Sequence, residues 1–194
     1  MSTFSKIEPY IPENMSAELK SRYGELCDYL DNNIEFSHKD SEIHTKLHSA
    51  RVMLYARMLA NAIIPEDAES MEILAHAALF HDTQRYDDGL DTGHGARAAV
   101  HYADFCPQNK IPFHPESAII MKYHDLDDSL GIKAMGKQYP DPERVKRLYA
   151  IFKDADALDR YRLGPDGLDS KYLRNAEAVS LMPFAKQLVS FTSE

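Results

Sequence analysis

The segment Leu74-Ala75-His76-Ala77-Ala78-Leu79-Phe80-His81-Asp82 is the most informative part of this chain. It begins as an apolar, helix-forming run and ends in two adjacent side chains that bind metal ions well. An imidazole nitrogen beside a carboxylate oxygen suits divalent transition metals and is also accepted by harder ions. Successive side chains on a regular helix point about 100° apart, so His81 and Asp82 converge only where the helix ends. Because a metal site needs three or four ligands, further ligands must come from elsewhere in the chain.

The chain has 194 residues, of which 44% are hydrophobic and 27% are charged, as is typical of soluble globular proteins. This length suits one core, so we expect a single domain over residues 1–194. The formal net charge of -9 argues against nucleic acid or a membrane as a partner. We find no segment near the ~18 apolar residues of a membrane span, and no signal-peptide pattern. Cys27 and Cys106 are isolated, which is typical of a reducing compartment, and we expect a cytoplasmic location.

Capping residues, prolines and apolar periodicity predict an all-α helical bundle. The segment Met1–Asn14 is expected to be an extended lead-in, and the acidic tract from Asp125 to Asp128 is expected to begin a solvated loop that reaches Pro140. Candidate N-caps are Ser16, Ser41, Thr92 and Asp141. The expected helices cover about 17–32, 42–63, 67–80, 93–105, 115–124, 142 toward 164, and a tail from about 176 that Pro183 should kink or restart.

The helix expected over Glu42–Ile63 carries polar side chains on its core-facing side. The side chains on or beside this buried face are His44, His48, Arg51 and Tyr55, whereas Lys46, Ser49 and Arg57 are expected to point away. An unpaired buried charge is costly, so these groups need partners. His48 is either a core histidine bonded to a backbone carbonyl or a metal ligand, and Arg51 lies one turn along, where it could meet an anion.

Three aspartates compete for a ligand role in the last helical segment before Gly164. The apolar residues from Val145 to Ala155 set the buried face, and Asp156 and Asp159 lie on or beside it. Asp154 lies roughly opposite and is expected to be solvated. Because a buried carboxylate must be paired, hydrogen-bonded or metal-bound, Asp156 is the best candidate for a remote ligand. Asp159 is expected to support the site or to accept a salt bridge.

The order His…His-Asp…Asp along a helical chain resembles the HD-domain superfamily of metal-dependent phosphohydrolases. The resemblance covers about His44 to Arg162. The segments similar to the three motifs of that superfamily are His48-Ser-Ala-Arg51-Val52, Ala77-Ala-Leu-Phe-His81-Asp82 and Asp154-Ala-Asp156-Ala-Leu158-Asp159. The resemblance implies a single-domain helical bundle of the HD type. It also implies that a divalent metal ion is bound by His48, His81, Asp82 and Asp156.

The same resemblance implies a function. HD phosphohydrolases bind Mn²⁺, Mg²⁺, Fe²⁺, Co²⁺, Ni²⁺ or Zn²⁺, and the sequence does not choose among these ions. The ion activates a water and orients a small-molecule phosphate substrate, most often a nucleotide. Some HD families hold a second ion with histidines between the second and third motifs, where His94 and His124 lie; either histidine could instead protonate the leaving oxygen. The expected catalytic residues are thus Asp82, His94 and His124. Arg51 and Arg85 are expected to bind phosphate, with an ion pair to a nearby aspartate as the alternative for both.

Three alternatives remain open from the sequence. An HD fold without catalysis could sense a nucleotide or a metal, and a di-iron HD-like protein could activate oxygen. The third alternative is a helical scaffold with satisfied core histidines, which leaves the convergence of buried His, Asp and Arg unexplained. His76, His101 and His114 match no motif and are expected to be structural or on the surface. The oligomeric state is left open.

Overall fold

The computed structural model describes residues 2–65 and 67–192, and every regular element within these ranges is helical. The predicted all-α class is therefore confirmed. In chain order the α-helices are α1 (Thr3–Ile7), α2 (Ala17–Asn33), α3 (Lys46–Ile63), α4 (Ala68–Phe80), α5 (His94–Asn109), α6 (Pro115–His124), α7 (Asp128–Gln138), α8 (Pro142–Leu158) and α9 (Ala176–Thr192). Three short 3-10 helices connect them: η1 (Glu8–Tyr10), η2 (Asp159–Leu163) and η3 (Ser170–Tyr172).

Several predicted helix starts are confirmed by their capping contacts. The side chains of Ser16, Asp67 and Asp141 each accept a hydrogen bond from a backbone N–H in the first turn of α2, α4 and α8 respectively. Such a bond satisfies one of the amides that a helix start leaves without a partner. These three helices therefore begin within a residue of where the sequence predicts.

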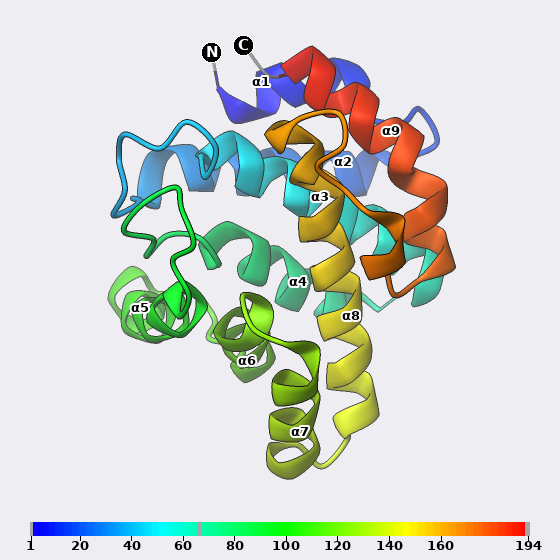
Figure 1. Ribbon diagram of the computed structural model, residues 1–194. Helices are drawn as coiled ribbons and strands as arrows, with labels where there is room; N and C mark the ends of the chain where they lie inside the picture. The colour runs from blue at the N-terminus through cyan, green and yellow to red at the C-terminus, as the bar shows by residue number, and fades with distance from the viewer. Residues whose placement is uncertain (1, 66, 193–194) are drawn as a thin grey trace.

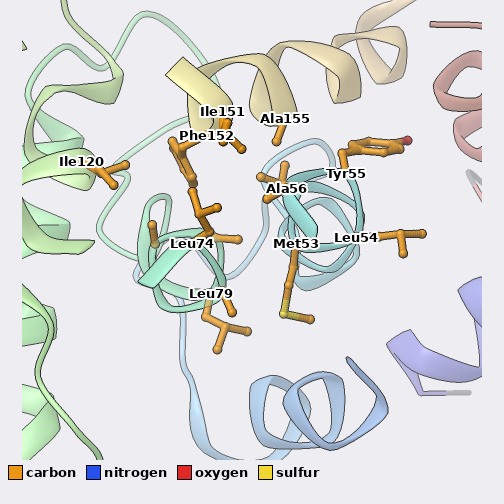
Figure 2. Close-up of a cluster of buried hydrophobic side chains, with 14 of the residues drawn as sticks. Met53, Leu54, Tyr55, Ala56, Leu74, Leu79, Ile120, Ile151, Phe152 and Ala155 are labelled. Atoms are coloured by element: carbon orange, nitrogen blue, oxygen red, sulfur yellow. The ribbon is translucent and has the colours of Figure 1, made fainter. Parts of the chain in front are cut away.

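Helices α3 and α4 form the centre of the molecule, and α8 packs across them (Figure 1). Their apolar side chains meet in one cluster, in which Met53 and Ala56 of α3 lie beside Leu74 of α4 and Phe152 of α8 (Figure 2). Helix α4 is buried on nearly every side, as its continuous apolar sequence predicts. Burying each large apolar side chain contributes about 1.5–3 kcal/mol, so this cluster holds the three helices in fixed register.

The first residues of the chain do not form the predicted extended lead-in. Ser2 caps α1, η1 follows directly, and the backbone N–H of Thr3 donates to the Asp31 carboxylate at 2.8 Å. Ile7 is fully buried, so this segment contributes to the core. Figure 1 shows α1 beside the end of α9. Met1 lies outside the described residues.

Helix α3 begins four residues later than predicted. Thr45 is its N-cap, and Ser41 instead donates to the Asp88 carboxylate at 2.5 Å. Because Asp88 also holds the ring of His44, the chain before α3 follows the loop after α4 rather than a helix. His44 therefore lies in a loop and not on a helix face.

Two further predictions in the second half of the chain are wrong. The segment expected to be a loop up to Pro140 contains α7, which is capped by Asp127. Helix α5 continues past Pro107 to Asn109, and its C-cap Lys110 is the one described non-glycine residue with positive φ (56°). Helix α9 also runs through Pro183, so the proline does not restart it, and the kink stays a prediction. A proline removes one backbone hydrogen bond, and packing of the rest of each helix outweighs that loss. Within residues 2–65 and 67–192, we find no helix with the length and apolarity needed to cross a lipid bilayer.

Candidate metal centre

Four predicted ligands from three helices meet at one point. His48 comes from the first turn of α3, His81 and Asp82 follow the last turn of α4, and Asp156 lies near the end of α8. His48 Nε2 lies 3.1 Å from His81 Nε2, 3.4 Å from Asp82 Oδ2 and 3.5 Å from Asp156 Oδ1. His81 Nε2 lies 3.6 Å from Asp82 Oδ2 and 3.9 Å from Asp156 Oδ1. His48, His81 and Asp82 thus form a buried triad whose donor atoms all face one another.

A second buried triad shares Asp82. His94 Nε2 lies 2.9 Å from His124 Nε2 and 3.0 Å from Asp82 Oδ1, and His124 Nε2 lies 3.7 Å from the same oxygen. One carboxylate therefore presents Oδ2 to the first histidine pair and Oδ1 to the second. A carboxylate in this position can bridge two ions, so the residues could hold one or two divalent metals.

The donor set fits a divalent metal ion. Ligand atoms at about 2.0–2.2 Å from a common ion are separated by roughly 3–3.5 Å in tetrahedral or octahedral geometry, which is close to the distances within both triads. Two imidazoles and a carboxylate in each triad match the ligand types that transition metals accept. The structure alone does not select the metal.

The remaining nitrogen of each imidazole fixes which atom is free to bind. The Nδ1 atoms of His81, His94 and His124 lie 2.9, 2.6 and 2.7 Å from the carbonyl oxygens of Ala78, Asp91 and Met121. His48 Nδ1 lies 2.8 Å from Asp159 Oδ2. Carbonyl and carboxylate oxygens only accept hydrogen bonds, so each Nδ1 carries the proton and donates. In each pair the Nε2 atoms then face one another and the Asp82 carboxylate, an arrangement that a cation between them stabilises.

The charges of the site act differently on its carboxylates and on its two histidine pairs. Burial lowers the pKa of His81 to about 3, so its ring is neutral near pH 7. Burial alone would lower the pKa of His124, but the Asp82 carboxylate raises it above its ordinary value, so a metal ion would compete with a proton at this ring. Burial alone would raise the pKa of Asp82, but the four imidazoles around it hold it well below its ordinary value. Burial acts on Asp156 in the same way, and the rings of His81 and His48 hold its pKa below the ordinary range. Both carboxylates are therefore ionised at neutral pH.

Local structure brings the second histidine pair together. Helix α5 starts directly against the end of α6, and a Cβ atom at Gly95 would collide with the carbonyl oxygen of Met121. Glycine at this position lets His94 approach His124. The preceding Gly93 has φ of 94°, a left-handed conformation that favours glycine, and its N–H donates to the Asp125 carboxylate. Asp125 therefore joins α5 to α6 rather than belonging to a solvated tract, and Asp128 likewise pairs with Lys153 and Arg174.

Arg51 lies behind the site and not at its mouth. Its Nε and Nη2 donate to the two oxygens of Asp159 at 2.6 and 2.9 Å, and Nη1 donates to Thr192 Oγ1 at 3.2 Å. The guanidinium is buried and does not line the pocket over the metal ligands. The structure thus offers Arg51 no path to a phosphate and instead makes it the partner of the carboxylate that orients His48. Asp159 has the supporting position that the sequence predicts.

The prediction that Asp154 is solvated is wrong. Its side chain is fully buried and accepts hydrogen bonds from the backbone N–H groups of Arg174 and Asn175, and from both of their side chains. The segment before α9 packs over this face of α8, so both faces of the helix are covered. Asp154 holds that segment in place, whereas the side chain of the candidate ligand Asp156 is 29% exposed and lines the pocket.

A pocket of about 580 Å³ lies over the candidate ligands. Asp82, Asp156, His94 and His124 contribute to its lining, and so does the predicted phosphate ligand Arg85. Arg85 Nε and Nη2 donate to the carbonyl oxygens of Asp87 and Gly89, and its Nη1 lies 3.1 and 3.2 Å from Nδ1 and Nε2 of His94 and 3.8 Å from Asp82 Oδ1. The charged side chains around the pocket are Arg85, Lys153, Arg160, Arg162 and Arg174, and Asp82, Asp125, Asp156, Asp166 and Asp169.

Three residues of this pocket with side chains suited to catalysis or phosphate binding, His44, Arg160 and Arg162, are among those that were not predicted as site residues. His44 directs Nε2 at Asp82 Oδ2, 4.0 Å away, while its Nδ1 lies 3.0 Å from the Asp88 carboxylate. Arg160 and Arg162 come from η2, directly after the ligand-bearing end of α8. Arg162 Nε donates to the carbonyl oxygen of Ile43, and Arg160 Nε donates to that of Gly167. The Arg-Tyr-Arg sequence directly after Asp159 could have indicated that these two arginines lie at the site.

The histidines that match no motif lie outside this centre. His76 is buried, and its Nδ1 lies 2.8 Å from the hydroxyl of Tyr102. His114 packs edge-on against His76, and His101 lies beside Phe80 and Phe105. Their contacts are those of packing residues.

No protein-family model matches this chain, and no significant match to a curated protein or to a solved structure is found. Any assignment of function therefore rests on the geometry of the His/Asp cluster and of the pocket above it.

Proposed function

We propose that this protein is a metal-dependent phosphohydrolase of the HD type that acts on a nucleotide or another small phosphate ester. The observation that carries the proposal is the pair of buried triads that share Asp82 beneath a pocket rich in arginine. The order of the ligands along the chain supports the HD assignment. His48, His81-Asp82 and Asp156 are joined by His94 and His124 in the interval where some HD families hold a second ion.

The residues of the site would have separate roles in binding metal and in handling protons. His48, His81, Asp82 and Asp156 would hold one ion, and Asp82 with His94 and His124 would hold a second. A bound divalent ion supplies an activated water and polarises a phosphoryl oxygen. Because Nε2 of His94 and of His124 faces Asp82, these rings are better placed as ligands than as proton donors. His44 Nε2 faces the same pocket from the other side and is placed to hold a proton near the reacting group.

The charge of the pocket supports an anionic substrate. Its cationic and acidic side chains balance in number, so bound divalent ions would make the pocket positive. Arg174 and Lys153 are already paired with Asp128. Arg160 Nε, Arg162 Nε and Arg162 Nη1 donate to backbone carbonyls, and both side chains line the same pocket, where their other guanidinium donors could meet a ligand. Arginine binds phosphate oxygens through such paired donors, so we assign phosphate binding to Arg85, Arg160 and Arg162.

A phosphate-release screen tests this function. Purified protein would be incubated with nucleoside mono-, di- and triphosphates and sugar phosphates, each with Mn²⁺, Mg²⁺, Co²⁺, Ni²⁺ or Zn²⁺. We expect release with at least one substrate, loss of release in Asp156→Ala, and unchanged release in Asp104→Ala, an exposed aspartate of α5. Metal-loaded protein that releases neither phosphate nor pyrophosphate from any compound would contradict the proposal and favour the sensor alternative.

A di-iron oxygenase is the second candidate, because four imidazoles and a shared carboxylate also suit iron. Iron in the purified protein together with oxygen consumption would favour it. Phosphate release with redox-inactive Mg²⁺ or Zn²⁺ would exclude it as the main activity.

A further inference from the structure

Within the part of the chain that the structure describes, residues 2–65 and 67–192, the buried guanidinium of Arg57 has no hydrogen-bond or ion-pair partner. It lies on α3, nine residues after His48 and about 14 Å farther along the helix. Only 3% of the residue is exposed, and its Nε and Nη1 atoms are buried without a hydrogen bond. The sequence predicts that this side chain points away from the core. It is covered because α2 and the start of α4 lie around it.

Arg51, on the same helix, is a buried guanidinium whose hydrogen bonds are satisfied, in contrast to Arg57. Both guanidiniums are buried to the same extent, yet Arg51 makes three hydrogen bonds to Asp159 and Thr192. The acidic group nearest to Arg57 is already occupied, because both oxygens of Glu72 accept hydrogen bonds from Arg22 at 3.0 and 2.7 Å. Burying a charge without a partner costs several kcal/mol, so a bound anion would relieve a large penalty.

A pocket of about 360 Å³ opens beside Arg57 between the start of α2 and the end of α3. Its neutral polar residues are Asn14, Ser16 and Asn61, and its apolar residues are Pro12, Met15, Leu19, Met58 and Ala62. None of these described residues is acidic. Ser16 is the N-cap of the 17-residue helix α2, whose first amides have no partner within the helix and attract negative charge.

A second pocket on the other side of Arg57 is less suited to an anion. It also includes Leu19 and Arg57, but Glu18, Glu25 and Glu72 contribute three carboxylates to its wall. These carboxylates would repel a negatively charged ligand. An anion paired with Arg57 would therefore occupy the pocket without acidic residues.

We infer that Arg57 anchors a second ligand site, separate from the metal centre, that binds a small organic monocarboxylate with an apolar body. The carboxylate pairs with the guanidinium and with the amide and hydroxyl groups of Asn61 and Ser16. The apolar body packs against Met15, Leu19 and Met58. One cation without a second favours a single negative charge over the double charge of a phosphomonoester. The site shares no lining residue with the pocket over Asp82, so it can be occupied independently of it.

Thermal unfolding in the presence of defined probes tests this site. Hexanoate and benzoate are the carboxylate probes, hexanol removes the charge, and inorganic phosphate offers a second charge. At ten times its dissociation constant, a carboxylate should raise Tm by about 3–6 °C in wild-type protein. We expect no such shift with hexanol and a smaller one with phosphate.

Variants assign the effect to Arg57. Arg57→Met should abolish the shift and should raise the Tm of the free protein, because it removes an unpaired buried charge. Ala62→Phe fills the pocket without changing its charge and should also abolish the shift. Arg147→Met, an exposed arginine of α8, is the matched control and should respond like the wild type. Asp82→Ala should also keep the shift, which separates this site from the metal centre.

Three results would overturn the inference. A carboxylate shift that persists in Arg57→Met would place the ligand elsewhere. The lack of any carboxylate shift in the wild type, at concentrations up to solubility, would show that the pocket does not bind this class. A lower Tm of free Arg57→Met, together with a normal response of Ala62→Phe to hexanoate, would mean that the guanidinium has a structural role.

Discussion

Nε2 of His48 lies 3.1 Å from Nε2 of His81, although Nδ1 of each ring is already bonded to an acceptor. Two neutral imidazoles in this tautomer cannot form a hydrogen bond with each other. The contact is therefore unfavourable unless a cation lies between the rings or one ring gains a second proton. Of these two, a metal ion also accounts for the carboxylates of Asp82 and Asp156 beside the pair.

Asp159 should control the affinity of the first ion without touching it. In Asp159→Asn the acceptor of His48 Nδ1 loses its charge, so the ring is a weaker and less well oriented ligand. We expect metal affinity at this triad to fall about 10–100-fold, whereas binding at His94 and His124 is unchanged. Titration of the metal-free protein with Zn²⁺, followed by calorimetry, measures both affinities. Equal weakening of both sites would contradict this role.

Arg51 and Arg162 should respond differently to loss of charge. Arg51→Met leaves Asp159 without its main cationic partner in the core, so we expect the free energy of unfolding to fall by about 3–5 kcal/mol. Arg162→Gln removes a donor from the pocket, and we expect kcat/KM to fall about 10–100-fold with a smaller loss of stability. Urea unfolding and steady-state kinetics separate the two effects. A folded, fully stable Arg51→Met with raised KM would restore the predicted phosphate role.

Alanine variants of Asp154 and Asp156 should have different effects on stability and metal content, although the two residues lie only two positions apart. Asp154→Ala leaves the amides of Arg174 and Asn175 without their acceptor, and we expect about 3 kcal/mol of destabilisation with full metal content per folded chain. Asp156→Ala should lose metal with a smaller change in stability of the metal-free protein. Elemental analysis beside urea unfolding checks this pair, and metal loss in Asp154→Ala would reverse the assignment.

Asp154 and Asp156 also show which features of the site could be predicted from the sequence. Apolar periodicity correctly set Asp156 on the side of α8 that meets α3 and α4, because that side is apolar along the whole helix. It failed for Asp154, because a second layer of chain covers the opposite side of α8. The same error applies to Arg57, which α2 and the start of α4 cover. Periodicity identifies one buried face, and it contains no information on elements that pack against the other.

Contacts between loops could not be predicted from the sequence either. His44 was predicted on a helix, but Asp88 and Ser41 bind one another across two loops and carry His44 to the pocket. Arg51 was a reasonable phosphate ligand by spacing alone, yet its partner Asp159 is distant in sequence. The helices and the ligand-bearing motifs depend on local pattern and could be predicted, whereas these pairings depend on the tertiary fold.

His76 gives the metal-free protein a specific pH dependence. Burial, with a smaller effect of His114, lowers its pKa to about 4, whereas the unfolded chain takes up the proton near pH 6.5. The unfolded state therefore binds more protons between these values, and stability is lost as the pH falls from about 6.5 to about 4. His76→Leu should reduce the slope of unfolding free energy against pH by up to about 1.4 kcal/mol per pH unit. Unfolding in urea with chelator at several pH values measures the slope, and an unchanged slope would refute the assignment.

The most direct test is the number of metal ions bound per chain, measured by elemental analysis after loading with Mn²⁺ or Zn²⁺ and desalting. Because Asp82 contributes an oxygen to both triads, wild-type protein and the control Asp104→Ala should each hold two ions per chain, and Asp82→Ala should hold neither at full occupancy. Wild-type protein that binds no ion under any loading condition, or Asp82→Ala that keeps two, would contradict a metal centre built on this residue.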